Sequence, residues 1–357
     1  MTENLRNKCE LFERNRAAIA KKFLFEKAMM SIAAGLLFTG ADKEADPDRL
    51  TECRSILNRH TGVFSEYRDA VKLALISEMA LSDDAERYIE DVKAVYQKLH
   101  KGHFVDNSYM ILAAMLICDL GRQDDADAVI EKHNALMKQM EKDHPFLTDS
   151  EDISFVILLA LSDRPVDAIL RDMEEGMVYL KTICKVRVGS DPVQRLSEIL
   201  ALTEGDIREK CDKVVRLYDA LQQNKEATEG GDVFASLGML IGMEEEPEVI
   251  VCEILDAYAY LKDNKLFDDK SDGKKQRLML AELLVADCYG TGAAMIGSAF
   301  ISSALSVIRA QQIATIISVV SHVLPAVLNA AADQSSSETS EDTASTETDT
   351  DPQNEKR

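Results

Sequence analysis

Apolar and polar positions repeat along this chain with a period of about forty residues. Five segments share one plan, in which an apolar stretch is followed by a short polar turn and then an amphipathic helix. Each amphipathic helix carries apolar or semi-polar residues at positions i, i+3, i+7 and i+10, which form one stripe at 3.6 residues per turn. The stripes are Ile89/Val92/Tyr96/Leu99, Ile130/His133/Met137/Met140, Leu170/Met173/Met177/Leu180, Cys211/Val214/Tyr218/Leu221 and Val251/Ile254/Tyr258/Leu261, after a weaker copy at Leu50/Cys53/Leu57/His60.

The register of these stripes is kept closely along the chain. Successive stripes begin 39, 41, 40, 41 and 40 residues apart, starting from Leu50. The apolar stretches end at matching steps, at Leu81, Leu120, Leu161, Leu202 and Met243. The pattern therefore predicts a repeated helix pair, with a further first helix over residues 273–287.

The turns inside each pair carry start signals for the second helix. Asp83 and Asp84 precede one such helix, and Asp124 and Asp125 precede the next. Pro165 stands in the first turn of a third helix, after Asp163. Small acidic residues are favoured at helix N-termini, because the free N–H groups there donate hydrogen bonds to acceptor side chains and attract negative charge, and proline is favoured in the first turn because it needs no N–H donor there.

These patterns predict an all-α protein, because one alternating run, residues 185–188, is too short for a sheet. A single helix pair cannot bury its apolar face, so neighbouring pairs must stack. We expect residues 1–290 to form an α-solenoid of about six helix-pair repeats of about forty residues, closer to the HEAT and armadillo class than to shorter repeats.

The composition changes after Asp287. Residues 288–332 contain a single charge, Arg309, and two uncharged stretches of about 20 residues, which is long enough to cross a bilayer. Their many small residues suit either a helical cap on the last repeat or close packing in a membrane. We expect residues 291–332 to be an apolar helical segment of one of these two kinds, with the cap or partner-binding helix preferred.

Residues 333–357 form a second kind of segment. They contain eight acidic and two basic residues, five serines and five threonines, and no large apolar residue. Such a segment has nothing to bury, so we expect a disordered, solubilising tail.

The overall charge argues against a nucleic-acid partner and for a basic protein or peptide. The formal net charge is -22, from 63 acidic and 41 basic residues. Sequence-independent nucleic-acid binding depends on basic residues, so we expect no nucleic-acid partner and a basic protein or peptide instead. The seven cysteines are widely spaced, and the first residues contain no apolar h-region, so we expect a cytoplasmic protein without disulfides or a signal peptide.

Candidate chemistry is sparse. His100 and His103 are spaced H-x-x-H where a helical zinc pair needs i, i+4, so we expect a polar turn, and we expect His133 to be a half-buried stripe residue. We expect His144, before Pro145, to lie in a loop between repeats. We expect three acidic clusters to be helix caps or solvated turns: Asp42/Glu44/Asp46/Asp48, Asp124/Asp125/Asp127 and Glu244/Glu245/Glu246. We do not expect Gly290-Thr291-Gly292 to be a phosphate-binding loop, because no strand precedes it and no lysine follows it. We expect the tyrosines and methionines of the stripes to be core residues.

Four blocks of sequence, FLFEKAMMSIAAGLLFTG, HPFLTDSEDISFVILLALSD, ILALTEGDIREKC and GKKQRLMLAELLVAD, resemble an uncharacterised bacterial family known only as a domain of unknown function. The resemblance covers residues 5–290 and implies an all-helical fold in a bacterial cytoplasm. It implies no activity, cofactor, metal or site residue. We therefore expect a non-enzymatic scaffold for protein–protein interaction; the alternative is a membrane-associated adaptor anchored through residues 288–332, and the sequence leaves the oligomeric state open.

Overall fold

The structure is a computed structural model of the 357-residue chain. It describes residues 1–24, 28–61, 71–101, 108–144, 152–183, 189–202, 204–224, 231–267 and 270–289. The regular elements in these ranges are all helices, which confirms the all-α prediction for the described part of the chain. They are α1 Glu3–Lys22, α2 Ala28–Gly40, α3 Pro47–His60, α4 Lys72–Leu81, α5 Ala85–His100, α6 Ser108–Asp119, α7 Ala126–Asp143, α8 Asp152–Leu161, α9 Val166–Ile183, α10 Ser190–Leu200, α11 Ile207–Gln222, α12 Gly231–Ser236, the 3-10 helix η2 Leu237–Leu240, α13 Pro247–Asp263 and α14 Ser271–Tyr289.

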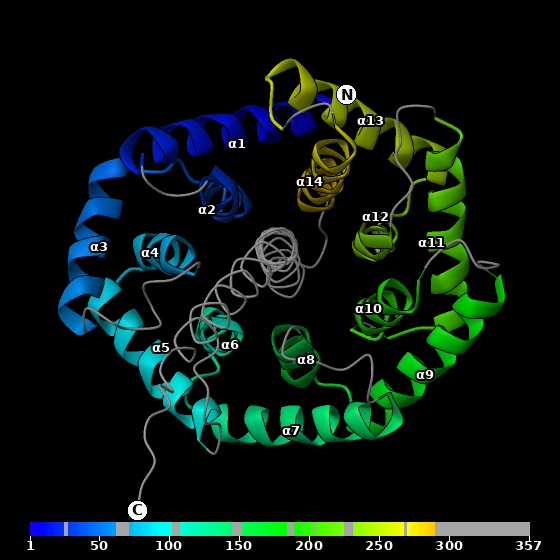
Figure 1. Ribbon diagram of the computed structural model, residues 1–357, viewed down its shortest axis with the longest axis horizontal. Helices are drawn as coiled ribbons and strands as arrows, with labels where there is room; N and C mark the ends of the chain where they lie inside the picture. Colours follow the sequence, from blue (N-terminus) through cyan, green and yellow to red (C-terminus); the bar gives the residue numbers. More distant parts are fainter. Residues whose placement is uncertain are drawn as a thin grey trace, which may run out of the picture. The chain divides into compact units, whose positions relative to one another are not determined.

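The helices named above lie in two concentric circles (Figure 1). The odd-numbered helices form the outer circle and run along its circumference, and the even-numbered helices form the inner circle and are seen end-on. Successive outer helices contact one another, as do most successive inner helices. Each outer helix is thus paired with an inner one, in the order in which the sequence alternates between apolar stretches and amphipathic helices.

The stripes predicted from the sequence are the buried faces of the outer helices. Along α11 and α13 every stripe residue is at most 5% exposed, and along α5 at most 6%. In α7 and α9, the residues Ile130, Met137 and Leu170 are only partly buried and pack at the edge of the core. The opposite face of each outer helix is polar, because it meets solvent.

The inner helices are buried on all sides. Every residue of α6 from Tyr109 to Ile117 is at most 4% exposed. Helix α6 packs against the outer helix α5 and the inner helix α8. This explains why the first segment of each repeat reads as a continuous apolar stretch rather than a stripe.

Acidic caps begin several outer helices, as the sequence predicted. Asp84 accepts a hydrogen bond from the Arg87 N–H at 3.1 Å, and Asp206 accepts from Arg208 and Glu209. Asp125 is at the N-cap of α7 but makes no cap hydrogen bond, because Arg122 binds its carboxylate through both nitrogens at 3.0 and 2.5 Å.

Lysines and arginines bind carbonyl oxygens at the C-terminal ends of the inner helices. We call these residues the capping cations. They come from the outer helix before or after the inner helix or from a turn nearby. They favour the structure because a helix C-terminus carries partial negative charge. The contacts are Lys8 to Thr39 (3.2 Å), Lys43 to Leu81 (3.4 Å), Arg122 to Leu161 (3.5 Å), Lys132 to Ser162 (2.6 Å), Arg164 to Ala201 (2.5 Å), Lys210 to Leu200 (2.9 Å) and Lys213 to Ile241 (3.0 Å).

The first helix meets the last two, so the circle is closed. Helix α1 contacts α13 and α14, which lie more than 220 residues away in sequence. Its residues Leu5, Cys9 and Phe12 join the core of the α9–α14 half, whereas Ile19 and Phe23 join the core of the α2–α9 half. The end of an open array would need a separate cap, whereas here α1 and α14 cover one another.

Several predictions fall on residues outside the described ranges. These are the alternating run 185–188, the segment 291–332 and the tail 333–357. Within the described ranges, none of the helices combines the length and the apolar character that a membrane crossing requires. The six cysteines described there are free thiols.

Candidate binding site

Carboxyl side chains of α4 and α6 interact electrostatically with one another and with Tyr88 of α5. Glu78 lies in the last turn of α4, and Asp119 ends α6. Tyr88, in the first turns of α5, donates a hydrogen bond from its hydroxyl to Asp119 Oδ1 at 2.6 Å. Asp91, one turn further along α5, pairs with Arg87 at 3.6 Å. Asp83 lies in the turn between α4 and α5, and we call Glu78, Asp83, Asp91 and Asp119 together the acidic corner.

The pKa values of Asp119 and Glu78, the two carboxyls at the centre of the acidic corner, are both raised. Desolvation by the surrounding helices raises the pKa of Asp119 to about 7. Desolvation, followed by repulsion from Asp119, raises the pKa of Glu78 well above its ordinary value. Asp119 itself remains exposed at the edge of the corner, so a ligand in solution can reach it. A cation placed between the two carboxyls would lower both pKa values.

The charge two residues after the first stripe position varies along the chain. There α7 carries Lys132 and α11 carries Lys213, and both are capping cations. The same position is acidic in α3, α5, α9 and α13, at Glu52, Asp91, Asp172 and Glu253.

A groove of about 500 Å³ lies between α3 and the start of α5. Its two arginines are already paired: Arg49 with Glu52 at 2.8 Å, and Arg59 with Glu86. Asp83 is at its edge and forms no ion pair within the described part of the chain. The groove is lined by Arg49, Glu52, Ser55, Ile56, Arg59, Asp83, Asp84, Ala85 and Glu86.

A second groove, of about 480 Å³, lies along the outer face of α9 and reaches α11. Val178 on its floor is 55% exposed. Arg208 binds Glu175 at 2.8 Å and lies over the ring of Tyr179, whose hydroxyl donates to Asp212 at 2.9 Å. These charges are satisfied within the groove, so it offers mainly an apolar and aromatic surface.

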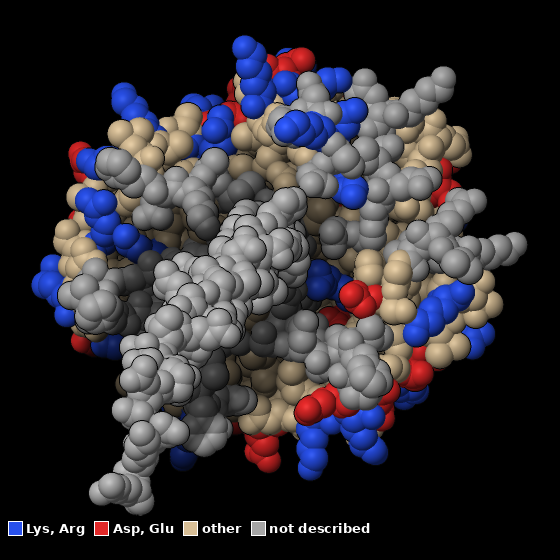
Figure 2. Space-filling model, in the orientation of Figure 1, with Lys and Arg blue, Asp and Glu red and all other residues tan. Residues whose placement is uncertain are grey.

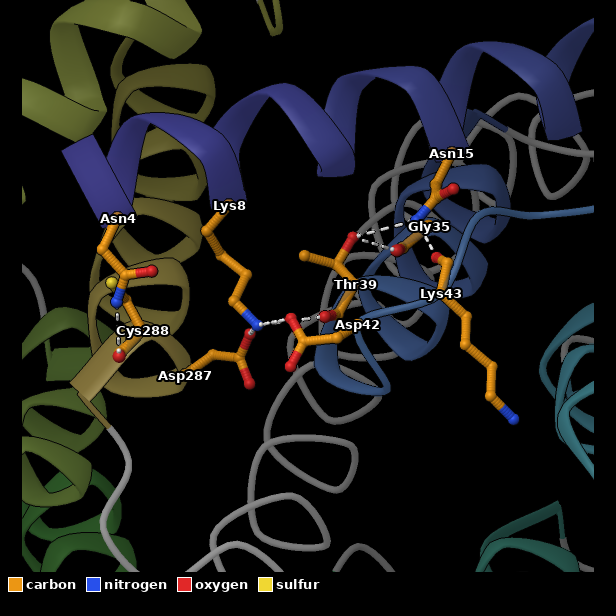
Figure 3. A network of polar contacts seen from close by, with 9 residues as sticks. All are labelled: Asn4, Lys8, Asn15, Gly35, Thr39, Asp42, Lys43, Asp287 and Cys288. Carbon is orange, nitrogen blue, oxygen red and sulfur yellow. Dashed lines mark hydrogen bonds and ion pairs between the residues drawn. The ribbon is translucent and has the colours of Figure 1, made fainter.

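The contacts that close the circle form a third polar network (Figure 3). The Lys8 ammonium points between Asp42, at 2.6 Å, and Asp287, at 2.8 Å, and also donates to the carbonyl of Thr39. Asn4 donates from Nδ2 to the carbonyl of Cys288 at 3.4 Å. These groups join α1, the end of α2 and the end of α14, so their role is structural.

Beside this network, Asn15 of α1 organises the turn after α2. It is 1% exposed and donates to the carbonyl of Lys43 at 3.0 Å, while its Oδ1 accepts from the Ala45 N–H at 2.8 Å. Thr39 completes the arrangement by donating to the carbonyl of Gly35 at 2.7 Å. One buried amide therefore fixes the path of the chain from α2 to α3.

The described histidines make contacts within or between the helices. His100 ends α5 and stacks on Tyr96, with ring centroids 5.5 Å apart, and His103 lies outside the described residues. His133 is 6% exposed and contacts Asn134, as expected for a stripe residue. His144 is the C-cap of α7 and pairs with Glu174 at 2.8 Å. In the ranges that the structure describes, no group of three or more His, Cys, Asp or Glu side chains is arranged to hold a metal ion.

The predicted acidic turns are caps and ion pairs. Asp46 caps α3, Glu44 pairs with Arg14, and Asp48 pairs with Lys22. Asp127 pairs with Lys98, and Glu246 stands at the N-cap of α13 without a side-chain hydrogen bond. The role of Asp42 in closing the circle was not foreseen, because its partner Lys8 lies 34 residues earlier in the chain. Gly290, Thr291 and Gly292 lie outside the described residues.

The tyrosines of the stripes and all their methionines except Met137 are core residues. Tyr218 and Tyr258 are 5% and 3% exposed, and Met140 and Met177 are 3% and 2% exposed. The sequence did not single out Glu78, Tyr88, Asp91 or Asp119.

The fold defines a class: in the ranges that the structure describes, this is an all-helical protein of paired helices. The chain belongs to the family described as protein of unknown function (DUF4003), whose model matches residues 15–313. This confirms the family resemblance noted from the sequence. Comparison with curated proteins and with solved structures gives no match.

Proposed function

We propose that this chain is a non-enzymatic helical-repeat scaffold that binds a protein partner of net positive charge. The observation that carries the proposal is the surplus of acidic side chains on a circle of helix pairs with grooves between its outer helices. Stacked helix pairs present extended surfaces, and an opposite charge on the partner speeds association and fixes its orientation. The array is proposed to be an α-solenoid whose ends meet.

The side chains in the grooves support binding rather than catalysis. In the α9 groove, Arg208, Glu175 and Tyr179 stabilise one another. Tyrosine and arginine are the residues that most often contribute binding energy at protein interfaces. Around the rim of the face drawn in Figure 2, acidic and basic side chains are interspersed, so this face does not favour a strongly charged polymer.

The test is isolation of partners on the tagged full-length protein at low salt, followed by purification of each retained protein and direct measurement of binding. We expect a partner of basic isoelectric point whose dissociation constant rises with salt concentration. The proposal would be wrong if no purified protein bound directly, or if binding were independent of salt.

A further inference from the structure

We propose that a small cavity between α7, α9 and α10 binds one soft monovalent metal ion, Cu(I), through the thioether sulfurs of Met140, Met173 and Met177. All three methionines line the cavity. Its volume is about 30 Å³, which is enough for a single ion of the size of a water molecule. This inference goes beyond the scaffold function and does not depend on it.

The helices bring the three side chains together by their spacing. Met173 and Met177 are four residues apart on α9, so they leave the same face of that helix on successive turns. Met140 reaches the cavity from the C-terminal part of α7, the neighbouring outer helix. Met140 and Met173 belong to one hydrophobic core and Met177 to the other, so the cavity lies where the two cores meet.

Among the stripes of α3, α5, α7, α9, α11 and α13, methionine occurs only in α7 and α9. The position of Met140 is leucine in α5, α9, α11 and α13. In α5, α11 and α13, the position of Met173 is valine or isoleucine, and that of Met177 is tyrosine. Burial of the stripe therefore does not require methionine, and the thioethers add metal donors that these other repeats lack.

The chemistry of the cavity favours a soft ion of low charge. Thioether sulfur is a soft ligand that selects Cu(I), whereas magnesium and calcium ions take oxygen ligands. The three methionines are at most 7% exposed, and their neutral sulfurs do not offset the cost of burying a doubly charged ion. In the ranges that the structure describes, no group of three or more His, Cys, Asp or Glu side chains is arranged for such an ion.

A polar pair lies on the solvent side of the cavity. His144 and Glu174 also line it, and their side chains are 26% and 55% exposed, whereas the methionines are buried. The Nε2 atom of His144 lies 2.8 Å from Oε2 of Glu174. An ion can therefore enter from this side, and the carboxylate beside the cavity balances its single positive charge.

The test uses the purified full-length protein with carbon-13 in its methionine methyl groups, and Ag(I) in chloride-free buffer as a redox-inert substitute for Cu(I). Accessible thiols are first blocked with N-ethylmaleimide, because Cys252 is exposed and thiolates also bind soft metal ions. We expect the methyl signals of Met140, Met173 and Met177 to shift and to saturate at one Ag(I) per chain. The signals of the buried methionines of α6 should stay in place.

Leucine variants separate the sulfur from its volume, because leucine replaces methionine in a core at little cost to folding. The site variant combines Met173→Leu and Met177→Leu. The control combines Met110→Leu and Met115→Leu in α6, where both side chains are also buried, at 4% and 1% exposed. Competition with a Cu(I) chelator, on thiol-blocked protein, should show at least about tenfold weaker binding by the site variant and less than about twofold by the control.

A pair of single substitutions on α7 covers the case in which the double variant does not fold. Met140→Leu removes the ligand that α7 supplies and should weaken Cu(I) binding severalfold. Met137→Leu is the matched control, since Met137 packs at the edge of the core and does not line the cavity. Equal binding by these two variants would overturn the proposed ligand set.

Three further results would overturn the site. If Ag(I) shifted none of the three methyl signals, the cavity would be a feature of core packing alone. Equal losses of Cu(I) affinity in the site and control variants would place the ion elsewhere. If zinc ions produced the same methyl shifts, the site would not select a soft monovalent ion. The partner-binding test decides the scaffold function separately, so either proposal can fail without the other.

Discussion

Two buried ionisable residues of α14, Arg277 and Glu282, differ in whether their surroundings stabilise the charged side chain. Arg277 is 1% exposed and donates to the carbonyls of Leu266 and Phe267 at 2.9 and 3.1 Å, and so fixes the turn after α13, where Phe267 has a φ of +64°. Glu282 is fully buried and accepts a hydrogen bond from Ser236 of α12. Its second oxygen, Oε1, has no hydrogen-bond partner among the described residues. The charged guanidinium of Arg277 is therefore stabilised by hydrogen bonds, whereas the surroundings of Glu282 favour the protonated, neutral carboxyl group.

Glu282→Gln should make stability less dependent on pH. Burial raises the pKa of Glu282 well above its ordinary value, so the folded protein keeps a proton that the unfolded chain has already lost. Stability therefore falls as the pH rises above the ordinary carboxyl range, by up to about 1.4 kcal/mol per pH unit for one proton. Urea unfolding of the variant at pH 5 and pH 8 should show a smaller difference than for the wild type.

The matched control is Glu44→Gln, because the Glu44 side chain is 71% exposed. This substitution should leave the pH dependence of unfolding unchanged. Equal pH dependence in the wild type and the Glu282→Gln variant would contradict the assignment of a protonated Glu282.

At the scale of elements, η2 and α10 approach one another so closely at Gly238 that a side chain there would clash. A Cβ on Gly238 of η2 would lie 2.7 Å from Leu196 Cδ1 and 2.9 Å from Ile199 Cγ2, both on α10. Such distances force one of the two elements to move. The irregular α12–η2 segment, where the other inner positions have a single helix, passes α10 at this point.

Gly238→Ala should therefore destabilise the protein by about 1–3 kcal/mol, the usual cost of overpacking a core. Gly242→Ala, four residues along, is the control, since a Cβ there would meet nothing within 4 Å. Urea unfolding measures both effects. If the two variants were equally stable, the close contact of η2 with α10 would be wrong.

At the scale of the whole molecule, as far as the structure describes it, closure of the circle depends on α1. The apolar residues of this helix belong to two hydrophobic cores. The apolar residues of α1 supply the contact area, and Lys8 supplies the charge that matches Asp287. The side chains of Lys8 and Asp287 are only 10% and 15% exposed, so solvent weakens this pair much less than the pairs on the surface.

Lys8→Met should cost about 2 kcal/mol of stability, because it leaves Asp287 without its cation in a poorly solvated place. Hydrogen exchange should accelerate first in α1 and α14. Lys22→Met removes a pair with Asp48, whose side chain is 93% exposed, and should have little effect. Uniform acceleration over all helices in the Lys8→Met variant would argue against a local closing contact.

The sequence predicted more of the elements than of their arrangement. The stripe residues Cys211, Val214, Tyr218 and Leu221 are buried as their spacing indicated, and Asp84 caps the helix that it precedes. The pair α1 and α2 was not recognised as part of the repeat. The site was also missed, because Glu78, Tyr88 and Asp119 belong to three helices and no spacing in the sequence joins them.

What the sequence by itself determined is local: helix pairs, their period, their buried stripes and the polar turns between them. These follow from hydrogen bonding and burial within about forty residues, which one repeat contains in full. Only the tertiary structure decided that the pairs close into a circle and that Lys8 meets Asp287. Closure depends on small rotations between neighbouring pairs that add up over the described unit, and no single repeat encodes that sum.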